Sequence, residues 1–524
     1  MQDRDYPYPS RRNLVYGYDG MVATGNALAA SVGMEMLKQG GNAIDAAIAT
    51  AYTLTIVEPS ANGLGGDLFA IVDMNGERVG LSSHGHAPEL LTLDLLAARG
   101  HSEMPIYGVL PVTVPGMVAG LSALWRRFAT LGYETLVSPA IRYAIDGYAL
   151  QPNATDAFNR AASKYREALP DFPELSSWFK SFAPQDEHFA EGERITFPAA
   201  ASALESIAAS EGRSFYHGDI ADAIDRFMRE YDGCLRKSDL QSFEPEWVTP
   251  LQTDYKGHTI YEIPPSGQGI TVLMALNTMK ETGVTSHTSI EALKLALSHV
   301  MRHVADDMAF DLDDLLTAYP KKAAELIGEE AVEPEAVDLL QGGTVYLATA
   351  DRFGNMVSLI QSNYMGFGSG VVEPTFGISL HNRACNFSVD PASRNAVAPG
   401  ERPLQTIIPG FIEKKGEFKG PFGIMGGFMQ AQAHVQVLLS LIEDGLNPQA
   451  ALDRPRWQWK GKKDIIVEPG FDKQVIEDLK ARGHEIAIEK NVNEFGRGQI
   501  ILRREDGLLI GACEPRTDSL VIPW

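Results

Sequence analysis

The residues best placed to do chemistry lie in the last third of the chain, where Gly342 and Gly343 directly precede Thr344. The next stretch, TVYLATA-DRFGN-MVSLIQS over 344–362, alternates around a turn and predicts an antiparallel hairpin starting at Thr344. A threonine hydroxyl is a weak nucleophile near pH 7 unless a base lies beside it. Cleavage before Thr344 would create an α-amine, reference pKa about 7.7–8.0, suited to that role. The alternative is a threonine that merely begins a strand after a flexible glycine turn.

A second candidate element is GPFGIMGGFMQAQAHVQVLLSLIEDG, residues 420–445. Its pattern predicts a strand, a turn at Gly426 and Gly427, and an amphipathic helix that ends at Gly445. Backbone N–H groups at the start of a helix are unpaired and favour negative charge. The pair is therefore a candidate oxyanion hole, although a tight turn required by packing would have the same sequence.

Predicted helices and strands, which must hold these residues in place, alternate along the chain. Residues 27–59 predict two helices separated at 40–42, and 62–85 predict two strands joined through Asn75 and Gly76. Residues 115–240 are mostly helical in pattern, 257–265 predict a strand and 269–283 a buried helix. The GLGG stretch at 63–66 resembles a dinucleotide loop but lacks the G-x-G-x-x-G spacing. Interleaved strands and helices indicate a layered α/β protein.

Composition excludes several classes of protein. The 524 residues carry a net charge of −23, which argues against a nucleic-acid or anionic-membrane partner. Three scattered cysteines are too few for a disulfide framework or a zinc site: Cys234, Cys385 and Cys513. The first 20 residues have no apolar signal core, so we expect a cytoplasmic protein.

A zinc hydrolase is one alternative. His299 and His303 lie four residues apart on a predicted helix, with Asp306 and Asp307 just beyond. The segment HVMRH lacks the glutamate of H-E-x-x-H, and an exposed histidine face explains it as well. A binding protein that keeps an enzyme fold without catalysis is a further alternative.

Many segments in order along the chain resemble the γ-glutamyltransferase family of N-terminal-nucleophile hydrolases. They include NALAASVGMEMLKQGGNAIDAAIA, EPSANGLGGDLFAIV, LPVTVPGMVAG, FYHGDIADAI and GERPLQTIIPGF, together with the hairpin and GIMGGFMQ. The resemblance implies a four-layer αββα sandwich of the α/β (α+β) class. It also implies self-cleavage into a large subunit, 1–343, and a small subunit, 344–524, intertwined as a heterodimer that could itself dimerise.

The resemblance assigns roles to several residues. Thr344 matches the nucleophile, Ser362 a hydroxyl residue that hydrogen-bonds it, and Gly426 and Gly427 the oxyanion glycines. Other positions depart from the family pattern in the substrate pocket. His84 replaces an arginine that binds the glutamyl carboxylate in the family, and Asn386 replaces an acid that binds the glutamyl amine. A pair of serines in the family is replaced by Gln405 and Thr406, and an asparagine is replaced by Tyr364.

These departures remove paired charges that would recognise an amino-acid head group, contacts worth about 1.5–3 kcal/mol each. Arg383 offers a different site for a substrate carboxylate, or an ordinary ion pair. The pattern is closer to the divergent hydrolase branch, which includes glutathione hydrolase-like, cephalosporin-acylase-like and oxamate amidohydrolase members. We therefore expect hydrolysis of a small carboxylate-bearing amide through an acyl-enzyme, without metal or organic cofactor. A γ-glutamyl transpeptidase or glutathione hydrolase is the alternative.

Overall fold

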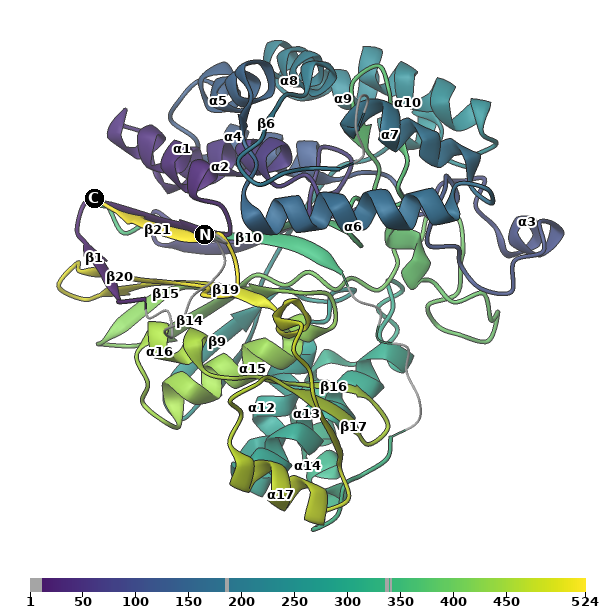
Figure 1. The fold of residues 1–524 in the computed structure, drawn as a ribbon. Helices are drawn as coiled ribbons and strands as arrows, with labels where there is room; N and C mark the ends of the chain where they lie inside the picture. Colours follow the sequence, from purple (N-terminus) through teal and green to yellow (C-terminus); the bar gives the residue numbers. More distant parts are fainter. Residues whose placement is uncertain (1–11, 184–187, 335–338, 340–341) are drawn as a thin grey trace.

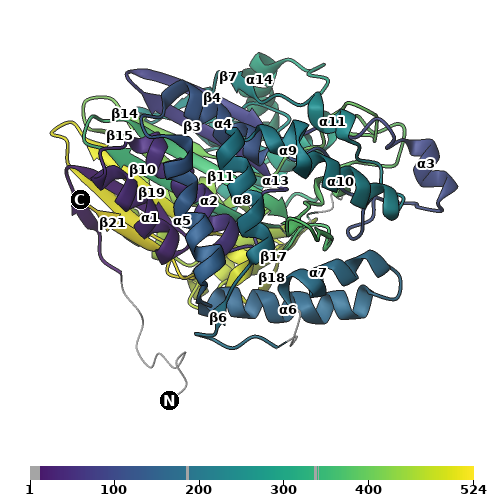
Figure 2. The same ribbon diagram turned by 90° about the horizontal axis from the view of Figure 1, so that it is seen from above.

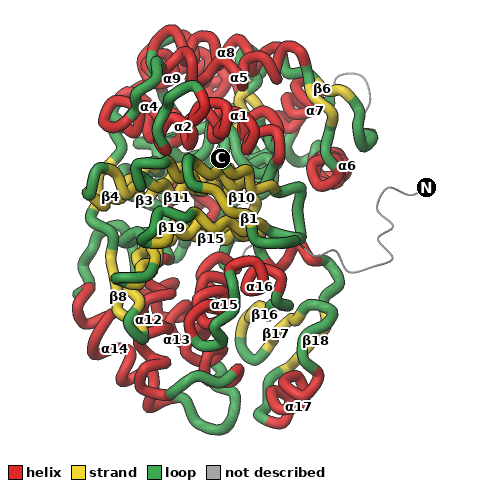
Figure 3. The backbone as a smooth tube through the Cα atoms, turned by 90° about the vertical axis from the view of Figure 1, so that its left-hand side faces the viewer, coloured by secondary structure: helices red, strands yellow, loops and turns green. Residues whose placement is uncertain are grey.

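The computed structural model describes residues 12–183, 188–334, 339 and 342–524. Part of the N-terminal stretch, residues 1–11, lies outside this description. Two seven-stranded sheets lie face to face, and helices cover the outer face of each sheet (Figure 1). Figure 3 shows the same order of layers from the side: helices, sheet, sheet, helices. This is the four-layer αββα sandwich expected from the sequence.

The first sheet has the order β1-β20-β19-β15-β14-β9-β8, and every neighbouring pair is antiparallel. Its strands are β1 (Val15–Gly17), β20 (Leu509–Cys513), β19 (Arg497–Arg504), β15 (Phe418–Met425), β14 (Gly410–Lys414), β9 (His258–Glu262) and β8 (Leu251–Tyr255).

The second sheet has the order β21-β2-β10-β11-β3-β4-β7 and is also antiparallel throughout. Its strands are β21 (Leu520–Pro523), β2 (Gly20–Thr24), β10 (Gly343–Asp351), β11 (Met356–Tyr364), β3 (Asp67–Met74), β4 (Glu77–Ser83) and β7 (Glu246–Val248). Because both sheets are antiparallel, the α+β form of the expected class describes the molecule.

Two helical layers enclose the sheets, and Figure 2 looks down on one of them with the strands behind it. The layer on the second sheet contains α1 (Ala27–Lys38), α2 (Ala43–Val57), α4 (Met117–Phe128), α5 (Tyr133–Asp146) and α8 (Pro198–Ser210). The layer on the first sheet contains α12 (Gly269–Thr282), α13 (Ser286–His303), α14 (Leu312–Leu326), α15 (Met429–Ile442), α16 (Pro448–Asp453) and α17 (Lys473–Ala481).

Further helices and three small sheets complete the fold. The remaining helices are α3 (Leu93–Ala98), α6 (Pro152–Ala168), α7 (Ser176–Phe182), α9 (Arg213–His217), α10 (Asp219–Glu230) and α11 (Lys237–Gln241). Small sheets pair β5 (Tyr148–Ala149) with β6 (Arg194–Ile195), β12 (Val372–Glu373) with β13 (Ile378–Ser379), and join β16 (Trp457–Gly461), β17 (Asp464–Val467) and β18 (Glu485–Ile488). None of the helices in the described ranges combines the length and apolar composition of a membrane span.

The three largest apolar cores lie between the layers. One fills the space between the second sheet and its helices, one lies between the first sheet and its helices, and one lies between the two sheets. Strand β3, with sequence DLFAIVDM, is buried along its whole length because both of its faces are covered. Helix α2 is likewise buried at all 15 positions, and a capping box of Asn42 and Asp45 defines its start.

The local predictions from the sequence are confirmed for these elements. Asn75 and Gly76 have positive φ values of 54° and 83° in the turn between β3 and β4. The GLGG stretch leads into β3, where a side chain on Gly66 would meet the carbonyl oxygen of Ser362 at 2.5 Å. Close backbone packing therefore accounts for this glycine, as the lack of nucleotide-loop spacing predicted.

Candidate active site

The bond between Gly343 and Thr344 lies at the start of β10, in contact with the end of β11. Gly343 pairs with Tyr364, but the register then shifts, because Val345 pairs with Gln361. The extra residue of this β-bulge is on β11, beside Ser362. Bulges of this kind redirect side chains and are common next to active sites.

The Ser362 hydroxyl connects both sides of that bond. It donates a hydrogen bond to the Gly343 carbonyl oxygen at 2.8 Å and accepts one from the Tyr364 N–H at 2.8 Å. The Thr344 hydroxyl oxygen lies 3.1 Å from the Ser362 oxygen. Since the single Ser362 proton points to the carbonyl, the Thr344 hydroxyl is the donor in that last contact. The predicted nucleophile, its partner hydroxyl and the Gly343–Thr344 bond are thus together, and Thr344 and Ser362 are fully buried.

Tyr364 fixes the end of β11 in an unusual backbone conformation. Its φ of 74° lies in the left-handed region, and it is fully buried, whereas other non-glycine residues with positive φ in the described ranges are exposed. Such a conformation costs of order 1–3 kcal/mol for a bulky residue. The Arg383 guanidinium carbon lies 4.2 Å from the centre of its ring.

Arg383 belongs to a buried polar cluster built around Asp67. One Asp67 carboxylate oxygen lies 2.9 Å from Arg383 Nε, 3.0 Å from the Gln405 side-chain nitrogen and 3.2 Å from His381 Nδ1. Arg383 Nη1 also donates to the Thr406 hydroxyl at 2.9 Å. In the uncut chain Arg383 therefore forms an ion pair with Asp67, which was the alternative to a substrate-binding role. Its Nη2 finds no hydrogen-bond acceptor among the described residues, and its role toward a substrate carboxylate stays a prediction.

The electrostatics of this cluster follow from its charges. Burial alone would raise the pKa of Asp67, but His381 and Arg383 lower it well below its usual range, so Asp67 is ionised. Asp67 also pairs in register with Ser362 across β3 and β11. The cluster thus anchors the strand segment that presents Ser362 to the Gly343 carbonyl.

His84 occupies the position of the family arginine without providing a charge. Burial, followed by repulsion from Arg402, lowers its pKa to about 3, so the imidazole is neutral at pH 7. Its ring nitrogens lie 3.1 Å from the Ser82 hydroxyl and 3.2 Å from the Ser266 hydroxyl. The ring also packs edge-on against Phe69 at 4.9 Å between centroids.

Asn386 ends the short 3-10 helix that begins at Arg383 and lies in the wall of a cavity. Its side-chain amide donates to the Leu404 carbonyl at 2.8 Å. The cavity has a volume of about 800 Å³ and is also lined by Cys385 and Phe428. The structure therefore brings His84, Arg383, Gln405 and Thr406 into one buried region, and it holds Asn386 against Leu404, the residue before Gln405.

The two glycines after β15 connect to the same region. Gln268 donates from its side-chain nitrogen to the carbonyls of Thr406 and Gly427, at 2.5 and 2.9 Å. Gly426 has a φ of 140°, and a side chain there would approach Gly496 Cα at 3.1 Å. The turn therefore requires glycine at 426, and the helix α15 begins directly after it, at Met429.

Behind this turn lies a buried pair of Glu262 and His434. Their closest atoms, Glu262 Oε1 and His434 Nδ1, are 2.8 Å apart, and His434 Nε2 accepts the Ile424 N–H at 3.1 Å. Because Nε2 is an acceptor, Nδ1 carries the proton and donates to Glu262. Burial raises the pKa of Glu262. The pair holds the end of β15, two residues before Gly426.

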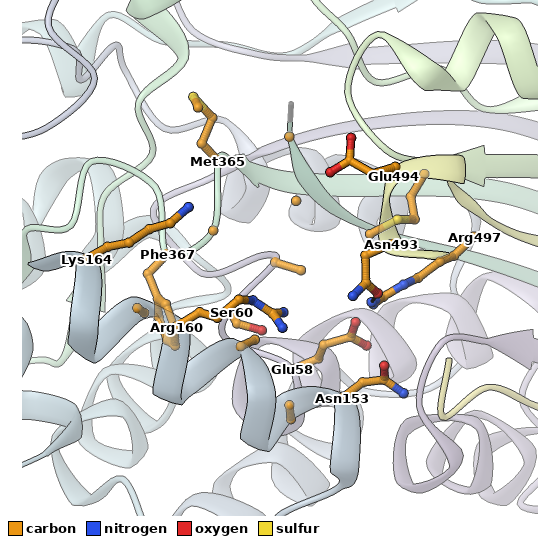
Figure 4. A pocket seen from close by; sticks show the side chains of 18 of the residues that line it. Glu58, Ser60, Asn153, Arg160, Lys164, Met365, Phe367, Asn493, Glu494 and Arg497 are labelled. Carbon is orange, nitrogen blue, oxygen red and sulfur yellow. Dashed lines mark hydrogen bonds between the residues drawn. The ribbon is translucent and has the colours of Figure 1, made fainter. Parts of the chain in front are cut away.

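A cavity of about 480 Å³ adjoins the Gly343–Thr344 bond. Gly342, Gly343 and Met425 all line it, so the neighbours of Thr344 and of Gly426 share one space. Figure 4 shows Arg160 and Lys164 extending from α6, Glu58 and Ser60 on a second wall, and Asn493, Glu494 and Arg497 opposite. The volume suits a small molecule.

The sequence of the chain matches a known protein family along most of its length. The profile of the family described as Gamma-glutamyltranspeptidase matches residues 29–524. The chain belongs to the γ-glutamyltranspeptidase family. It is 31% identical to the glutathione hydrolase-like YwrD proenzyme of Bacillus subtilis (strain 168), over 97% of this chain and 99% of the relative. It is also 31% identical to the oxamate amidohydrolase proenzyme of Klebsiella pneumoniae subsp. pneumoniae, over 95% and 97%.

A solved structure gives the same result for the fold. The crystal structure of cephalosporin acylase from Bacillus halodurans superimposes with a TM-score of 0.95 at 46% identity, covering 100% of this chain and 99% of that one. The γ-glutamyltransferase family, the N-terminal-nucleophile fold and the hydrolase class predicted from the sequence are confirmed. The relatives include proenzymes named for two different substrates. Membership of the family therefore does not specify the substrate, which has to be argued from the residues of this chain.

The zinc alternative finds no third ligand beside its two histidines among the described residues. His299 and His303 pack ring to ring at 4.5 Å, and His299 lies against Tyr319 at 4.2 Å. Asp306 accepts the Arg402 backbone N–H, and Asp307 pairs with Arg394.

A different group in the described part of the chain does bring three metal-ligating side chains together: His287, Glu291 and His484, with ligand atoms within 4.8 Å. Lys294 already donates to Glu291 at 2.8 Å. Glu291 also accepts the Val332 N–H at 3.0 Å. The group therefore holds the backbone at Val332.

Sequence reasoning missed three residues of the candidate site. Asp67 begins the fully buried strand β3, and Glu58 is the C-cap of the fully buried helix α2. An acid at the end of a buried element was therefore the available signal. Gln268 has no comparable signal, because a glutamine near a helix start is ordinary.

Proposed function

We propose that the chain cleaves itself between Gly343 and Thr344 and then acts as an N-terminal-threonine amidohydrolase on a small carboxylate-bearing amide. The observation that supports this most directly is the line of hydrogen bonds from the Thr344 hydroxyl to Ser362 and from Ser362 to the Gly343 carbonyl oxygen. The family of proenzymes to which the chain belongs supports it as well.

The geometry supplies the proton path for self-cleavage. As Thr344 Oγ bonds to the Gly343 carbonyl carbon, its proton passes to Ser362, and the Ser362 proton passes to the carbonyl oxygen. Breaking the C–N bond returns a proton to the Thr344 nitrogen and leaves an ester between Gly343 and the Thr344 oxygen. Water then hydrolyses the ester, which releases the Gly343 carboxylate and regenerates the Thr344 hydroxyl. The Thr344 amine, already freed when the C–N bond broke, acts as the base in later turnovers.

Turnover repeats the same chemistry on a substrate. The freed amine takes the proton of the Thr344 hydroxyl as the oxygen attacks the amide carbonyl, and the amine product leaves with a proton. Backbone N–H groups at Gly426 and Gly427 are the proposed donors to the oxyanion, where each such donor contributes roughly 10²–10³ in rate. Water releases the acyl group. Hydrolysis of a γ-glutamyl amide remains the second candidate, since a glutathione hydrolase proenzyme of Escherichia coli (strain K12) is 30% identical.

The experiment that tests this proposal compares the intact masses of wild type, Thr344→Ala and Thr344→Ser. We expect wild type to yield fragments of about 37 and 20 kDa, the 57.1 kDa chain divided in proportion to residue number. The smaller fragment begins at Thr344. Thr344→Ser keeps a hydroxyl and cleaves, whereas Thr344→Ala stays whole. A folded wild-type chain that stays whole after long incubation would refute self-cleavage and favour a non-catalytic binding protein.

A further inference from the structure

Three buried side chains in the helical layer on the first sheet bring ligand atoms close to one another. His287 and Glu291 lie one turn apart on α13, and His484 lies in the turn between α17 and β18. His287 and His484 are each 3% exposed, and Glu291 is not exposed at all. His484 Nε2 lies 2.9 Å from His287 Nδ1 and 3.5 Å from Glu291 Oε1. Two imidazole nitrogens and a carboxylate oxygen are thus within reach of a single ion.

Backbone groups hold the far sides of two of these side chains. His287 Nε2 lies 3.0 Å from the Gly328 carbonyl oxygen, and Glu291 Oε2 accepts the Val332 N–H at 3.0 Å. Because a carbonyl oxygen only accepts, His287 Nε2 carries a proton, and Nδ1 of the neutral ring directs its lone pair into the group. Partners of this kind behind a histidine and a carboxylate orient the ligands of metal sites.

His484 is the member of the group whose hydrogen bonding is incomplete. Its Nδ1 is buried and has no hydrogen-bond partner among the described residues. A neutral imidazole has one proton. If that proton is on Nε2, Nδ1 is an unpaired acceptor; if it is on Nδ1, the lone pairs of His484 Nε2 and His287 Nδ1 face each other at 2.9 Å and require a cation between them. Hydrogen bonds within the described protein therefore do not complete this group, and buried polar groups without partners are rare.

Lys294 balances the charge of Glu291 in this structure. Its ammonium donates to Glu291 Oε1 at 2.8 Å and to the Val332 carbonyl oxygen, and the side chains of Lys294 and Glu291 are fully buried. An ion bound between Glu291 and the two histidines would share that carboxylate oxygen with the ammonium and would be repelled by it. Lys294 should therefore weaken metal binding.

We propose that His287, Glu291 and His484 form a structural site for a divalent transition-metal ion. Two imidazoles and one carboxylate suit zinc, whereas calcium and magnesium take oxygen ligands. His287 and Glu291 precede the Gly343–Thr344 bond and His484 follows it, so the ion would link the two fragments that self-cleavage produces. The site itself is independent of the proposed function, and only the link between separate fragments rests on it.

Zinc binding to the untagged, chelator-treated chain tests the site directly. We expect titration calorimetry to give one zinc ion per chain with a Kd of about 1 μM or tighter. His484→Gln should weaken binding by at least about 10²-fold, because a ligand contributes no less than the groups that orient it. His303→Gln, the same change at an exposed histidine of α13, is the matched control and should leave binding unchanged.

A gain of affinity separates the site from the effects of misfolding. Lys294→Met removes the competing ammonium, keeps an unbranched side chain and leaves the ion as the counter-charge of Glu291, so zinc should bind about tenfold or more tightly than to wild type. An unfolded variant cannot show this gain with one ion per chain. Binding no tighter than about 0.1 mM in both wild type and Lys294→Met, or binding unchanged by His484→Gln, would overturn the site.

The link between the fragments has a readout of its own. In processed wild type, zinc should raise the denaturant concentration at which the two fragments separate, because the ion binds the assembled protein. His484→Gln should abolish this rise and His303→Gln should keep it. Zinc binding without any rise would overturn the link. Zinc binding to a wild-type chain that stays whole would support the site and refute only the proposed self-cleavage.

Discussion

At the scale of single residues, Ser362 has the most consequential position. It is the only hydroxyl among the described residues recorded in contact with both the Thr344 oxygen and the Gly343 carbonyl. Its own place depends on the Tyr364 N–H at 2.8 Å and on the register of β11 against Asp67. A strained tyrosine and a buried ion pair therefore determine where one serine proton points.

Removing that proton should slow self-cleavage. We expect Ser362→Ala to lower the rate of fragment formation by roughly 10²-fold, because one donor to the developing oxyanion and the acceptor for the Thr344 proton are lost together. Ser362→Thr retains the hydroxyl and should restore much of the rate. A time course of the fragments by mass spectrometry measures the effect. Cleavage of Ser362→Ala at the wild-type rate would show that the proton path runs elsewhere.

The residue scale is also where sequence analysis is weakest. Thr344 and Ser362 are 18 positions apart on one hairpin, so local spacing could predict their contact. Arg383 and Asp67 are separated by 316 positions, and the partner of Arg383 depends on how β3 packs in the folded sheet. A replaced charge such as His84 is visible in the sequence, but its neutral state at pH 7 follows only from its burial. The spacing of residues along the sequence predicts neither which distant side chains pair nor how far burial shifts a pKa.

At the scale of elements, the alternation of apolar and polar residues was sufficient to predict the helices and strands around the site. The hairpin of β10 and β11, the helix pair α1 and α2, and the strand, glycine pair and helix from β15 to α15 lie where periodicity and turn residues predicted them. The β-bulge next to Thr344 was not predicted, since an extra residue in β11 leaves the alternation of the sequence almost unchanged. The antiparallel order of both sheets likewise depends on strands that are distant along the chain.

The turn between β15 and α15 should tolerate no side chain at its first glycine. Gly426→Ala would place Cβ 3.1 Å from Gly496 Cα at a φ of 140°, which L residues rarely adopt. We expect the processed variant to lose at least about 10²-fold in kcat, because the backbone donors after this residue move. Gly445→Ala, at the open end of α15 with nothing within 4 Å, is the control for a positive-φ glycine. Equal kcat values for both variants would remove the turn from the mechanism.

At the scale of the whole molecule, the cleavage bond does not divide two domains. Residues 1–343 supply β1, β8 and β9 to the first sheet and β2, β3, β4 and β7 to the second, and the remaining strands of both sheets come almost wholly from 344–524. The pairing of β2 with β10 and of β9 with β14 crosses the two segments inside each sheet. Cutting one peptide bond breaks none of these ladders, and the core between the sheets contains side chains of both segments.

The processed chain should therefore behave as one particle. We expect the two fragments to coelute on size exclusion with uncut Thr344→Ala and to separate only in denaturant, with a single unfolding transition. Either fragment expressed alone should fail to fold, because each would expose unpaired strand edges and core side chains that the other segment covers. Coexpression of the two segments should recover the particle and its activity. Fragments that part in native buffer, or that fold alone, would show that the sheets are less interdependent than their strand order indicates.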